Sequence, residues 1–253
     1  MNILNFRMQL NFFRMFKGKT VLITGGGKKV GRAIAENFFD LGANVVVNDI
    51  VKSSHTELKP QLLSSEKFLY SQGNIADLNY QERLVNDSLK KFSKIDFLIN
   101  NVGIGSGKGL FDLDPKLMEV AIKTNLIAPF FLSQKIAKQM VEKQISGVII
   151  FISSIHARIP SGNPDYSSTK SALEILTKEM AFELGPYGIR VNAIAPGKIT
   201  SKRQIDHRIP LLHQTGTPED IAKVTLFLCH DYSGYINGEI ITVDGGLSLS
   251  FPR

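Results

Sequence analysis

The chain has 253 residues, of which 43% are hydrophobic and 21% are charged, a balance typical of folded globular proteins. This composition excludes collagen-like, low-complexity and broadly disordered proteins, and the length suits one α/β domain. The chain contains 30 Lys and Arg against 23 Asp and Glu, a net charge of +7, but these cations are scattered along the sequence. We therefore expect no nucleic-acid binding.

The chain has a single cysteine, Cys229, which lies in the apolar run 224–229. A lone cysteine cannot form an internal disulfide, so we expect a reducing compartment, the cytoplasm, and a buried Cys229 on a helix. No apolar run approaches the about 20 residues that a membrane-spanning helix needs. Because His207, His213 and His230 lack a second ligand cluster at suitable spacing, we predict no metal site.

Residues 1–16 differ from the rest of the chain, since they are rich in Phe, Leu and Met and contain no acidic residue. They lack the apolar centre and the small-residue cleavage site of a signal peptide. We favour an over-long reading frame whose natural start is Met15. A targeting or membrane-surface helix and a hydrophobic arm over a subunit interface stay open. We treat residues 1–16 as a leader and residues 17–253 as one domain.

From Lys19 onward, short β-branched runs alternate with longer segments of helical periodicity. Gly42 is placed to end the first helix, and Asp112 and Asp114 to cap the helix that opens at Pro115. Continuous apolar strands separated by helices predict a doubly wound, Rossmann-like α/β fold with a parallel sheet covered on both faces. The predicted strands are 20–24, 44–48, 67–71, 95–99, 148–152, 189–195 and 239–243, and the predicted helices are 30–41, 77–92, 115–143, 164–184 and 218–230.

The residues that follow the predicted strands are polar or glycine at all but a few positions. Ligands of such sheets bind beyond the carboxyl ends of the strands, so these positions are expected to line a cleft. They are 24–31, Asp49, Asn74, 100–103, 153–154 and 196–197.

The first strand end carries the glycine-rich turn 24–31 between a strand and a helix. Glycines in this setting let the backbone approach a pyrophosphate, whose charge the helix N-terminus favours. Asp49 closes the second strand, where a carboxylate accepts hydrogen bonds from ribose hydroxyls and repels a 2′-phosphate. Lys28 favours NADP instead, because a cation in the turn attracts the 2′-phosphate. We favour NAD over NADP.

Tyr166 and Lys170 lie four residues apart at the start of a predicted helix, so they share one face. A free tyrosine has a pKa of about 10, and its ionisation at neutral pH requires about 4 kcal/mol. One ammonium about 4 Å away supplies that order of energy at an effective dielectric constant of about 20. The spacing predicts that Lys170 lowers the pKa of Tyr166 and makes its phenol a usable general acid/base.

Several short motifs occur in order along the chain. They are Thr-Gly-x-x-x-x-x-Gly (24–31), Asn-Asn-Val-Gly (100–103), Ile-Ser-Ser (152–154), Tyr-Ser-Ser-Thr-Lys (166–170), Ile-Ala-Pro-Gly (194–197) and Val-Asp-Gly-Gly (243–246). Together they resemble the short-chain dehydrogenase/reductase family, from Lys17 to about Ser250, and the chain is similar to 3-oxoacyl-ACP reductases and to hydroxysteroid or sugar dehydrogenases.

The resemblance implies an NAD(P)-dependent oxidoreductase that transfers a hydride between a nicotinamide and a carbonyl or secondary alcohol. It also implies a homo-oligomer, often a tetramer, formed through helices around 116–143 and 164–184.

The resemblance implies four catalytic residues. Asn125 would bend the central helix and hold a water that relays protons to Lys170. Ser154 would donate a hydrogen bond to the substrate oxygen, and Tyr166 would transfer the proton. Lys170 would lower the pKa of the tyrosine and hold the nicotinamide ribose. Ser153 stays a rival to Ser154, because the connection from this serine pair to the tyrosine is slightly shorter than is usual.

The resemblance also implies the residues that contact the cofactor. Asn74 and Ile75 would contact the adenine, and Asn101 and Gly103 would pass beside the adenosine ribose. The residues from Pro196 onward would hold the nicotinamide side. The full expected set is Thr24, Gly25, Gly27, Lys29, Val30, Gly31, Asp49, Asn74, Ile75, Asn101, Gly103, Tyr166, Lys170, Pro196, Gly197, Ile199 and Thr200.

Departures from the family pattern bear on the ligand. The family usually has glycine at Lys29 and alanine at Val102, and the Lys29 cation either pairs with a pyrophosphate or projects over the substrate entrance. The substrate lid 201–216 is short, which predicts an open pocket or one closed by another segment. His156 and Arg158 either line the pocket mouth or lie in a solvated loop.

Two alternative functions stay open. Lys28 and Lys29 fit a pteridine-reductase-like NADPH reductase. A non-catalytic nucleotide-sensing or scaffold protein on the same fold is the other, because fold does not determine function.

Overall fold

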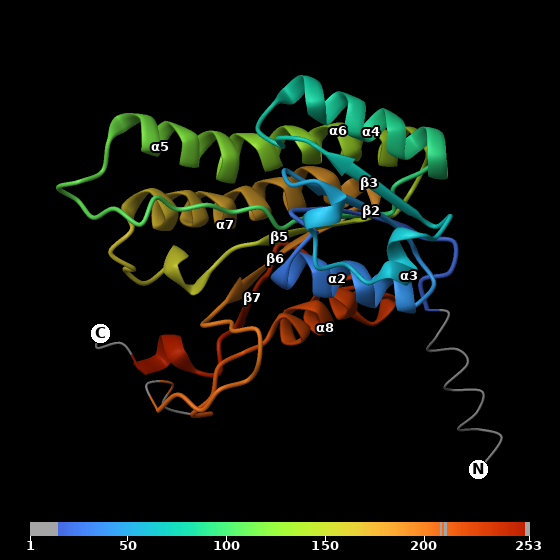
Figure 1. The fold of residues 1–253 in the computed structure, drawn as a ribbon. Helices are drawn as coiled ribbons and strands as arrows, with labels where there is room; N and C mark the ends of the chain where they lie inside the picture. Colours follow the sequence, from blue (N-terminus) through green and yellow to red (C-terminus); the bar gives the residue numbers. More distant parts are fainter. Residues whose placement is uncertain (1–14, 208, 210–211, 251–253) are drawn as a thin grey trace, which may run out of the picture.

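A parallel sheet of seven strands lies at the centre of the molecule (Figure 1). The structure is a computed structural model that describes residues 15–207, 209 and 212–250. The strand order is β3-β2-β1-β4-β5-β6-β7, and each neighbouring pair is parallel. This arrangement confirms the doubly wound fold. The strands are β1 (Thr20–Thr24), β2 (Asn44–Asp49), β3 (Phe68–Gln72), β4 (Phe97–Asn100), β5 (Val148–Ile152), β6 (Arg190–Pro196) and β7 (Ile240–Val243).

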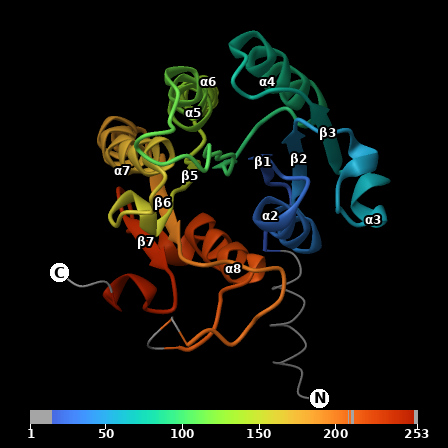
Figure 2. The ribbon, with the colours of Figure 1, turned by 60° about the vertical axis from the view of Figure 1, so that its left-hand side comes forward.

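Helices cover both faces of the sheet (Figures 1 and 2). One face carries α2 (Lys29–Asp40) and α8 (Pro218–Cys229). The other carries α4 (Leu78–Phe92), α5 (Pro115–Ile122), α6 (Ala128–Glu142) and α7 (Pro164–Leu184). The remaining short elements are α3 (Pro60–Leu63), η1 (Ser53–His55), η2 (Lys123–Ile127), η3 (Ile155–Ala157), η4 (Gly185–Tyr187), η5 (Asp231–Ser233) and η6 (Leu247–Ser250).

The predicted helix 115–143 is not one α-helix. The π-helical turn η2 separates α5 from α6. A π-turn inserts one extra residue into the helical ladder, which the hydrophobic period of a sequence does not reveal. The segments Ser53–His55 and Pro60–Leu63 also escaped prediction, because helices this short have no recognisable period.

Alternate strand residues supply two separate cores. Val21 and Ile23 of β1 pack toward α2 and α8, whereas Leu22 packs toward α4, α6 and α7. The same alternation divides Val45 and Val47 of β2 from Val46. Because both faces are buried, the central residues of strands such as β1, β2 and β5 are apolar at successive positions, which explains the continuous runs in the sequence.

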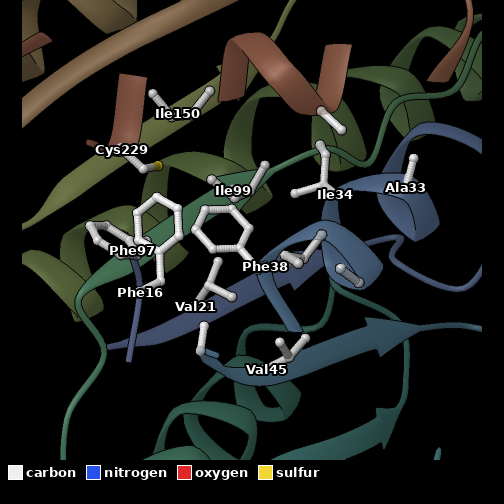
Figure 3. Packing of buried hydrophobic residues seen from close by; sticks show 14 of the residues in the cluster. Phe16, Val21, Ala33, Ile34, Phe38, Val45, Phe97, Ile99, Ile150 and Cys229 are labelled. Carbon is white, nitrogen blue, oxygen red and sulfur yellow. The ribbon is translucent and has the colours of Figure 1, made fainter. Parts of the chain in front are cut away.

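Phe16, placed in the leader by the sequence, packs in the core beneath the sheet. Its side chain is 2% exposed, and its ring centroid lies 4.8 Å from that of Phe38 and 5.6 Å from that of Phe97 (Figure 3). Its backbone N–H donates to the Leu41 carbonyl at 3.1 Å. Phe16 therefore packs as part of the folded domain, while residues 1–14 of the predicted leader lie outside the described residues.

Two predicted helix ends are present. Asp114 caps α5 by accepting a hydrogen bond from the Lys116 N–H at 2.6 Å, and Gly42 follows α2 with a φ of +92°. Cys229 is buried and free. Within the described part of the chain, no helix has both the length and the hydropathy of a membrane span, and His, Cys, Asp and Glu form no cluster suited to a metal.

Candidate active site

A cleft of about 720 Å³ opens beyond the carboxyl ends of the strands. It extends across the point between β1 and β4 where the strand order reverses, the usual ligand position in open α/β sheets. Its lining combines glycines, polar side chains and aliphatic side chains. The lining residues are Gly25, Lys28, Lys29, Val30, Gly31, Asn48, Asp49, Ile50, Gly73, Asn74, Ile75, Asn101, Val102, Gly103, Ile104, Val120, Thr124, Ile152, Ser153, Ser154, Tyr166, Lys170, Pro196, Gly197 and Ile199.

The glycine-rich turn packs tightly against the end of β4. A Cβ on Gly31 would lie 2.2 Å from the Gly25 carbonyl oxygen, so only glycine fits there. The Asn101 side-chain amide donates to the carbonyl oxygens of Thr24 and Gly25, each at 3.0 Å. The Thr24 hydroxyl accepts from the N–H groups of Asn101 and Val102. These bonds attach the glycine-rich turn to the end of β4. Thr24 itself is not in the cleft lining.

The N-terminus of α2 faces the cleft with an excess of positive charge. Lys28 is the N-cap but makes no capping hydrogen bond, and the first turn contains no acidic residue. Lys28 and Lys29 both line the cleft. Uncapped N–H groups, the helix dipole and two ammonium groups together suit a bound anion, and we call this end of α2 the candidate anion site. Lys29 has a φ of +49°, a left-handed backbone conformation that glycine adopts most readily. This conformation explains why glycine is the usual residue at this position in the family that the sequence resembles.

Asp49, the last residue of β2, lies directly beside the glycine-rich turn. Its Oδ2 accepts from the Gly27 N–H at 2.9 Å, and its Oδ1 accepts from the Val51 N–H at 3.3 Å. A Cβ on Gly27 would lie 2.7 Å from Oδ2, so glycine is required for this contact. The carboxylate is thereby fixed at both oxygens and keeps further acceptor positions for a ligand.

The end of the cleft beside β2 and β3 contains residues that the sequence did not single out. Asn48 is 1% exposed and donates to the Gly73 carbonyl and to the Tyr80 hydroxyl, each at 2.9 Å. The Tyr80 ring packs directly against Gly73. A Cβ on Gly73 would lie 2.1 Å from this ring, so no larger residue fits there. Asn74 and Ile75, predicted at this end, line the cleft beside them.

Tyr166, Lys170 and Ser154 meet on the opposite side of the cleft. The Ser154 hydroxyl interacts with the Tyr166 phenol in the direction that lowers the pKa of the phenol, and it accepts a hydrogen bond from the His156 N–H at 3.2 Å. The Lys170 ammonium donates to the Ile152 carbonyl at 2.7 Å and lies 5.7 Å from the centroid of the Tyr166 ring. The Ser153 hydroxyl is directed elsewhere, toward the Lys170 carbonyl at 3.4 Å. Of the two rival serines, Ser154 is the one whose hydroxyl affects the pKa of the phenol.

The predicted lowering of the Tyr166 pKa by Lys170 is wrong for this geometry. Burial raises the pKa of Tyr166 above its ordinary value, and the interaction with Ser154 offsets only part of that rise. Lys170 is 2% exposed, and burial lowers the pKa of its ammonium to about 8. The ammonium is directed at a backbone carbonyl rather than at the phenol oxygen, so desolvation dominates both groups.

Asn125 lies beneath the cleft within the π-helical turn, at 0% exposure. Its Oδ1 accepts from the Ile104 N–H at 2.9 Å, and its Nδ2 donates to the Ile104 carbonyl at 2.7 Å and to the Thr169 hydroxyl at 2.9 Å. The Asp165 Oδ2 accepts from the Ser106 N–H at 2.9 Å. Asn125 and Asp165 therefore fix the loop that follows Gly103.

The described residues of the predicted lid, 201–216, make contacts at its two ends and with α8. Ile199 pairs with Gly216, and Ile205 with Gln214, through isolated β-bridges. Arg203 forms an ion pair with Asp220 of α8 at 2.8 Å. Residues 208 and 210–211 lie outside the described residues.

Neither residue suggested for the pocket mouth is in the cleft lining. His156 lies in η3, and Arg158 forms an ion pair with Glu174 at 2.9 Å. This pair holds the Arg158 side chain against α7 instead.

The cleft gathers all the predicted cofactor residues except Thr24, Gly27 and Thr200. Thr24 supports the turn from below, the Gly27 N–H is bonded to Asp49, and the Thr200 hydroxyl is bonded to the lid. For every residue of the predicted set, inside or outside the lining, contact with a cofactor stays a prediction. The lining residues that the sequence missed are Asn48, Ile50, Gly73, Ile104, Val120, Thr124 and Ile152. Asn48 and Thr124 adjoin predicted residues, whereas the aliphatic ones carry no signal that separates them from core residues.

Comparisons with known proteins agree with this geometry. A family model described as Enoyl-(Acyl carrier protein) reductase matches residues 27–248. The chain is 36% identical to 7alpha-hydroxysteroid dehydrogenase of Escherichia coli K12, covering 90% of this chain and 94% of that protein. It is 32% identical to L-rhamnose 1-dehydrogenase (NADP(+)) of Thermoplasma acidophilum, covering 93% and 98%. A short-chain dehydrogenase from Leptospira borgpetersenii, solved with bound NAD+, superposes with a TM-score of 0.86 at 28% identity, covering 94% and 96%.

Proposed function

The chain belongs to the short-chain dehydrogenase/reductase family, and we propose on that premise that Tyr166 is its general acid/base. The protein is an NAD(P)-dependent oxidoreductase that transfers a hydride between a nicotinamide cofactor and a carbonyl or secondary-alcohol substrate. The observation that carries the proposal is that Ser154, Tyr166 and Lys170 line the same cleft, with the Lys170 ammonium 5.7 Å from the centroid of the Tyr166 ring.

The residues of the cleft fit a nicotinamide dinucleotide. The uncapped N-terminus of α2, with Lys28 and Lys29, suits the pyrophosphate, and Gly31 leaves the backbone open to it. We place the adenosine ribose against Asp49 and the nicotinamide side against Tyr166 and the β6 end. When bound, the cofactor supplies or accepts the hydride. A titration of the protein with reduced cofactor, followed by nicotinamide fluorescence, tests this placement.

The proton chemistry follows from the state of the three side chains. With its pKa raised by burial, the Tyr166 phenol is protonated at neutral pH and donates its proton to a carbonyl oxygen during reduction. Ser154 holds that oxygen by a hydrogen bond, and the Lys170 ammonium stabilises the phenolate that forms. In alcohol oxidation the phenolate takes the hydroxyl proton. Asn125 keeps its proposed place in the relay of protons to Lys170, and it also fixes Ile104.

Cofactor choice is set by opposed charges at one end of the cleft. Asp49 favours free ribose hydroxyls, while Lys28 and Lys29 attract a phosphate. We propose that NAD is preferred, because both Asp49 oxygens are fixed by backbone N–H groups. Comparison of kcat/KM for NAD+ and NADP+, in the native protein and in Asp49→Ala, tests this. A native preference for NADP+ would contradict it.

We propose a secondary hydroxyl on a ring as the substrate group. Ile104, Val120 and Ile199 give the cleft an apolar wall, which suits the face of a ring, and Ser154 and Thr124 supply hydroxyls. The sugar and steroid dehydrogenases among the relatives support this class. A panel of sugars, including L-rhamnose, and hydroxysteroids, run with both cofactors, tests it. Cofactor binding without turnover on any carbonyl or alcohol would favour the sensing or scaffold role.

A pteridine-reductase-like activity is the second candidate, because Lys28 and Lys29 both line the cleft. It predicts a strong preference for NADPH and consumption of dihydropterins. A clear preference for NAD would contradict it.

We further propose that the chain forms a homotetramer through α6 and α7. A groove of about 350 Å³ with Phe130, Leu176 and Leu184 in its wall lies between these helices, and Ile175 and Phe182 of α7 are 58% and 83% exposed. Such apolar exposure is typical of a subunit interface. Sedimentation of the native chain and of Phe182→Glu tests the assembly, since a charge at this position should dissociate it.

We propose the cytoplasm as the site of action, where the free thiol of Cys229 stays reduced. Cell fractionation tests this location.

A further inference from the structure

Two hydrogen bonds connect the carboxylate of Asp49 to Tyr70 on the neighbouring strand, β3. The Asp49 Oδ1 accepts from the Val51 N–H at 3.3 Å. The carbonyl of the same Val51 residue accepts from the Tyr70 hydroxyl at 2.6 Å. One residue, Val51, therefore connects the carboxylate in the cleft to the phenol of Tyr70, which is not in the cleft lining.

Tyr70 is held firmly enough to act as an anchor. It lies in β3, in register with Val47 of β2, and its ring lies 6.4 Å from that of Phe68. Burial, and next the negative charge of Asp49, raise the pKa of Tyr70 to about 12, so the phenol remains a donor at every physiological pH. A second bond from β3, from the Gln72 amide to the Ile50 carbonyl at 3.3 Å, fixes the preceding residue.

We infer that Tyr70 is a positioning residue that sets cofactor selectivity by holding Val51, and through it Asp49, in place. This inference rests on the proposed role of Asp49 toward the adenosine ribose. Removal of the Tyr70 hydroxyl removes the hydrogen bond that holds the Val51 carbonyl. Little packing replaces it in the segment after β2, because the side chain of the preceding residue, Ile50, is 66% exposed. A carboxylate that can turn away makes weaker directed bonds to ribose hydroxyls and repels a 2′-phosphate less. Selectivity, a difference between two affinities, should fall while both cofactors still bind.

The test is a double-mutant cycle on cofactor binding in the full chain. The Kd values of NAD+ and NADP+ are measured by calorimetry, without turnover, for the native protein, Tyr70→Phe, Asp49→Ala and the double variant. Tyr70→Phe keeps the ring and removes one hydroxyl. We expect it to lower the ratio of Kd for NADP+ to Kd for NAD+ about threefold to tenfold, the worth of one hydrogen bond. In the Asp49→Ala background the same change should leave the ratio where it is.

Two controls separate positioning from general damage. Tyr232→Phe removes a phenol that is 83% exposed and should leave the ratio unchanged. For Tyr70→Phe, kcat should stay within about twofold of the native value while KM for NAD+ rises, because a uniform loss of binding acts on KM. Thermal unfolding shows whether each variant is folded.

The outcomes distinguish the inference from the proposal beneath it. If Asp49→Ala lowers the ratio and Tyr70→Phe does not, the role of Tyr70 is overturned and that of Asp49 stands. An equal effect of Tyr70→Phe in both backgrounds also overturns it, because Tyr70 would then act without Asp49. If Asp49→Ala leaves the ratio unchanged, the proposed role of Asp49 fails and the inference fails with it.

Discussion

The ammonium of Lys170 donates a hydrogen bond to the backbone carbonyl of Ile152 at 2.7 Å. Ile152 is the last residue of β5, and the serine pair of the cleft follows it directly. The bond therefore fixes α7 against the end of the central strand. It satisfies one of the three ammonium protons. Burial, rather than this bond, lowers the pKa of Lys170 to about 8, because the charged form is desolvated.

This shift predicts how carbonyl reduction depends on pH. Lys170 is cationic below a pH of about 8 and loses its charge above it, while the raised pKa of Tyr166 keeps the proton donor intact over the same range. We expect kcat/KM for reduction to be level below about pH 8 and to fall about tenfold per unit above it. Lys170→Arg should remove this descending limb, since a guanidinium stays charged. A level profile through pH 9 in the native protein would contradict the prediction.

Tyr166→Phe tests the general acid/base directly. We expect kcat to fall about 10²-fold to 10⁴-fold, because the proton donor is lost and the ring that packs in the cleft is kept. The Kd of NADH, measured by fluorescence, should stay within about threefold, since the ring beside the nicotinamide side and all residues proposed for the pyrophosphate and adenosine are kept. Tyr235→Phe, which removes a fully exposed phenol, is the control and should keep native activity. Near-native turnover of Tyr166→Phe would exclude the mechanism.

Asn125→Ala tests the fixation of the loop after β4. The substitution leaves the N–H and carbonyl of Ile104 without their partners, so we expect a loss of about 2 to 4 kcal/mol in the free energy of unfolding. KM for the substrate should rise because Ile104 lines the cleft. Thr169→Val removes only the third bond of Asn125 and should cost less and leave KM unchanged. Equal costs for both variants would show that the contacts with Ile104 contribute little.

Local patterns in the sequence predicted most of the fold, and long-range contacts account for what they missed. The strand Thr20–Thr24 and the helix Pro164–Leu184 have the predicted bounds, because their periods and breakers are local. The π-helical turn at Asn125 and the burial of Phe16 depend on packing against distant segments. In the site, motif spacing brought Tyr166 and Ser154 together. It did not predict the raised pKa of Tyr166, since desolvation depends on everything packed around the phenol.

Lys29→Gly separates backbone strain from charge. Lys29 has a φ of +49°, and a side chain in this left-handed region costs about 1 to 2 kcal/mol. Glycine removes that cost but gains entropy in the unfolded chain, so we expect a net rise of about 0.5 to 1 kcal/mol in the free energy of unfolding. The expected rise in stability is measured by denaturant unfolding. Lys28→Gly is the control, because its φ of −146° carries no such strain. Unchanged stability would show that the strain is negligible.

The same substitution, Lys29→Gly, should weaken the binding of NADP+ more than that of NAD+, because it removes an ammonium group beside the candidate anion site. Calorimetric Kd values measure this effect.

Phe16→Ala and a chain that begins at Met15 together test where the folded domain starts. Phe16 is 2% exposed between Phe38 and Phe97, so its truncation should lower the free energy of unfolding by about 3 to 5 kcal/mol. Phe111→Ala, at a ring that is 95% exposed, should cost less than about 0.5 kcal/mol.

The chain that begins at Met15 keeps Phe16 and the hydrogen bond from its N–H to Leu41. We therefore expect native stability and native kcat/KM from it, measured by denaturant unfolding and by the cofactor-coupled assay. A loss of stability on removing residues 1–14 would show that the domain needs them, contrary to the leader interpretation. A loss of activity at unchanged stability would instead favour an arm that reaches an interface or the cleft.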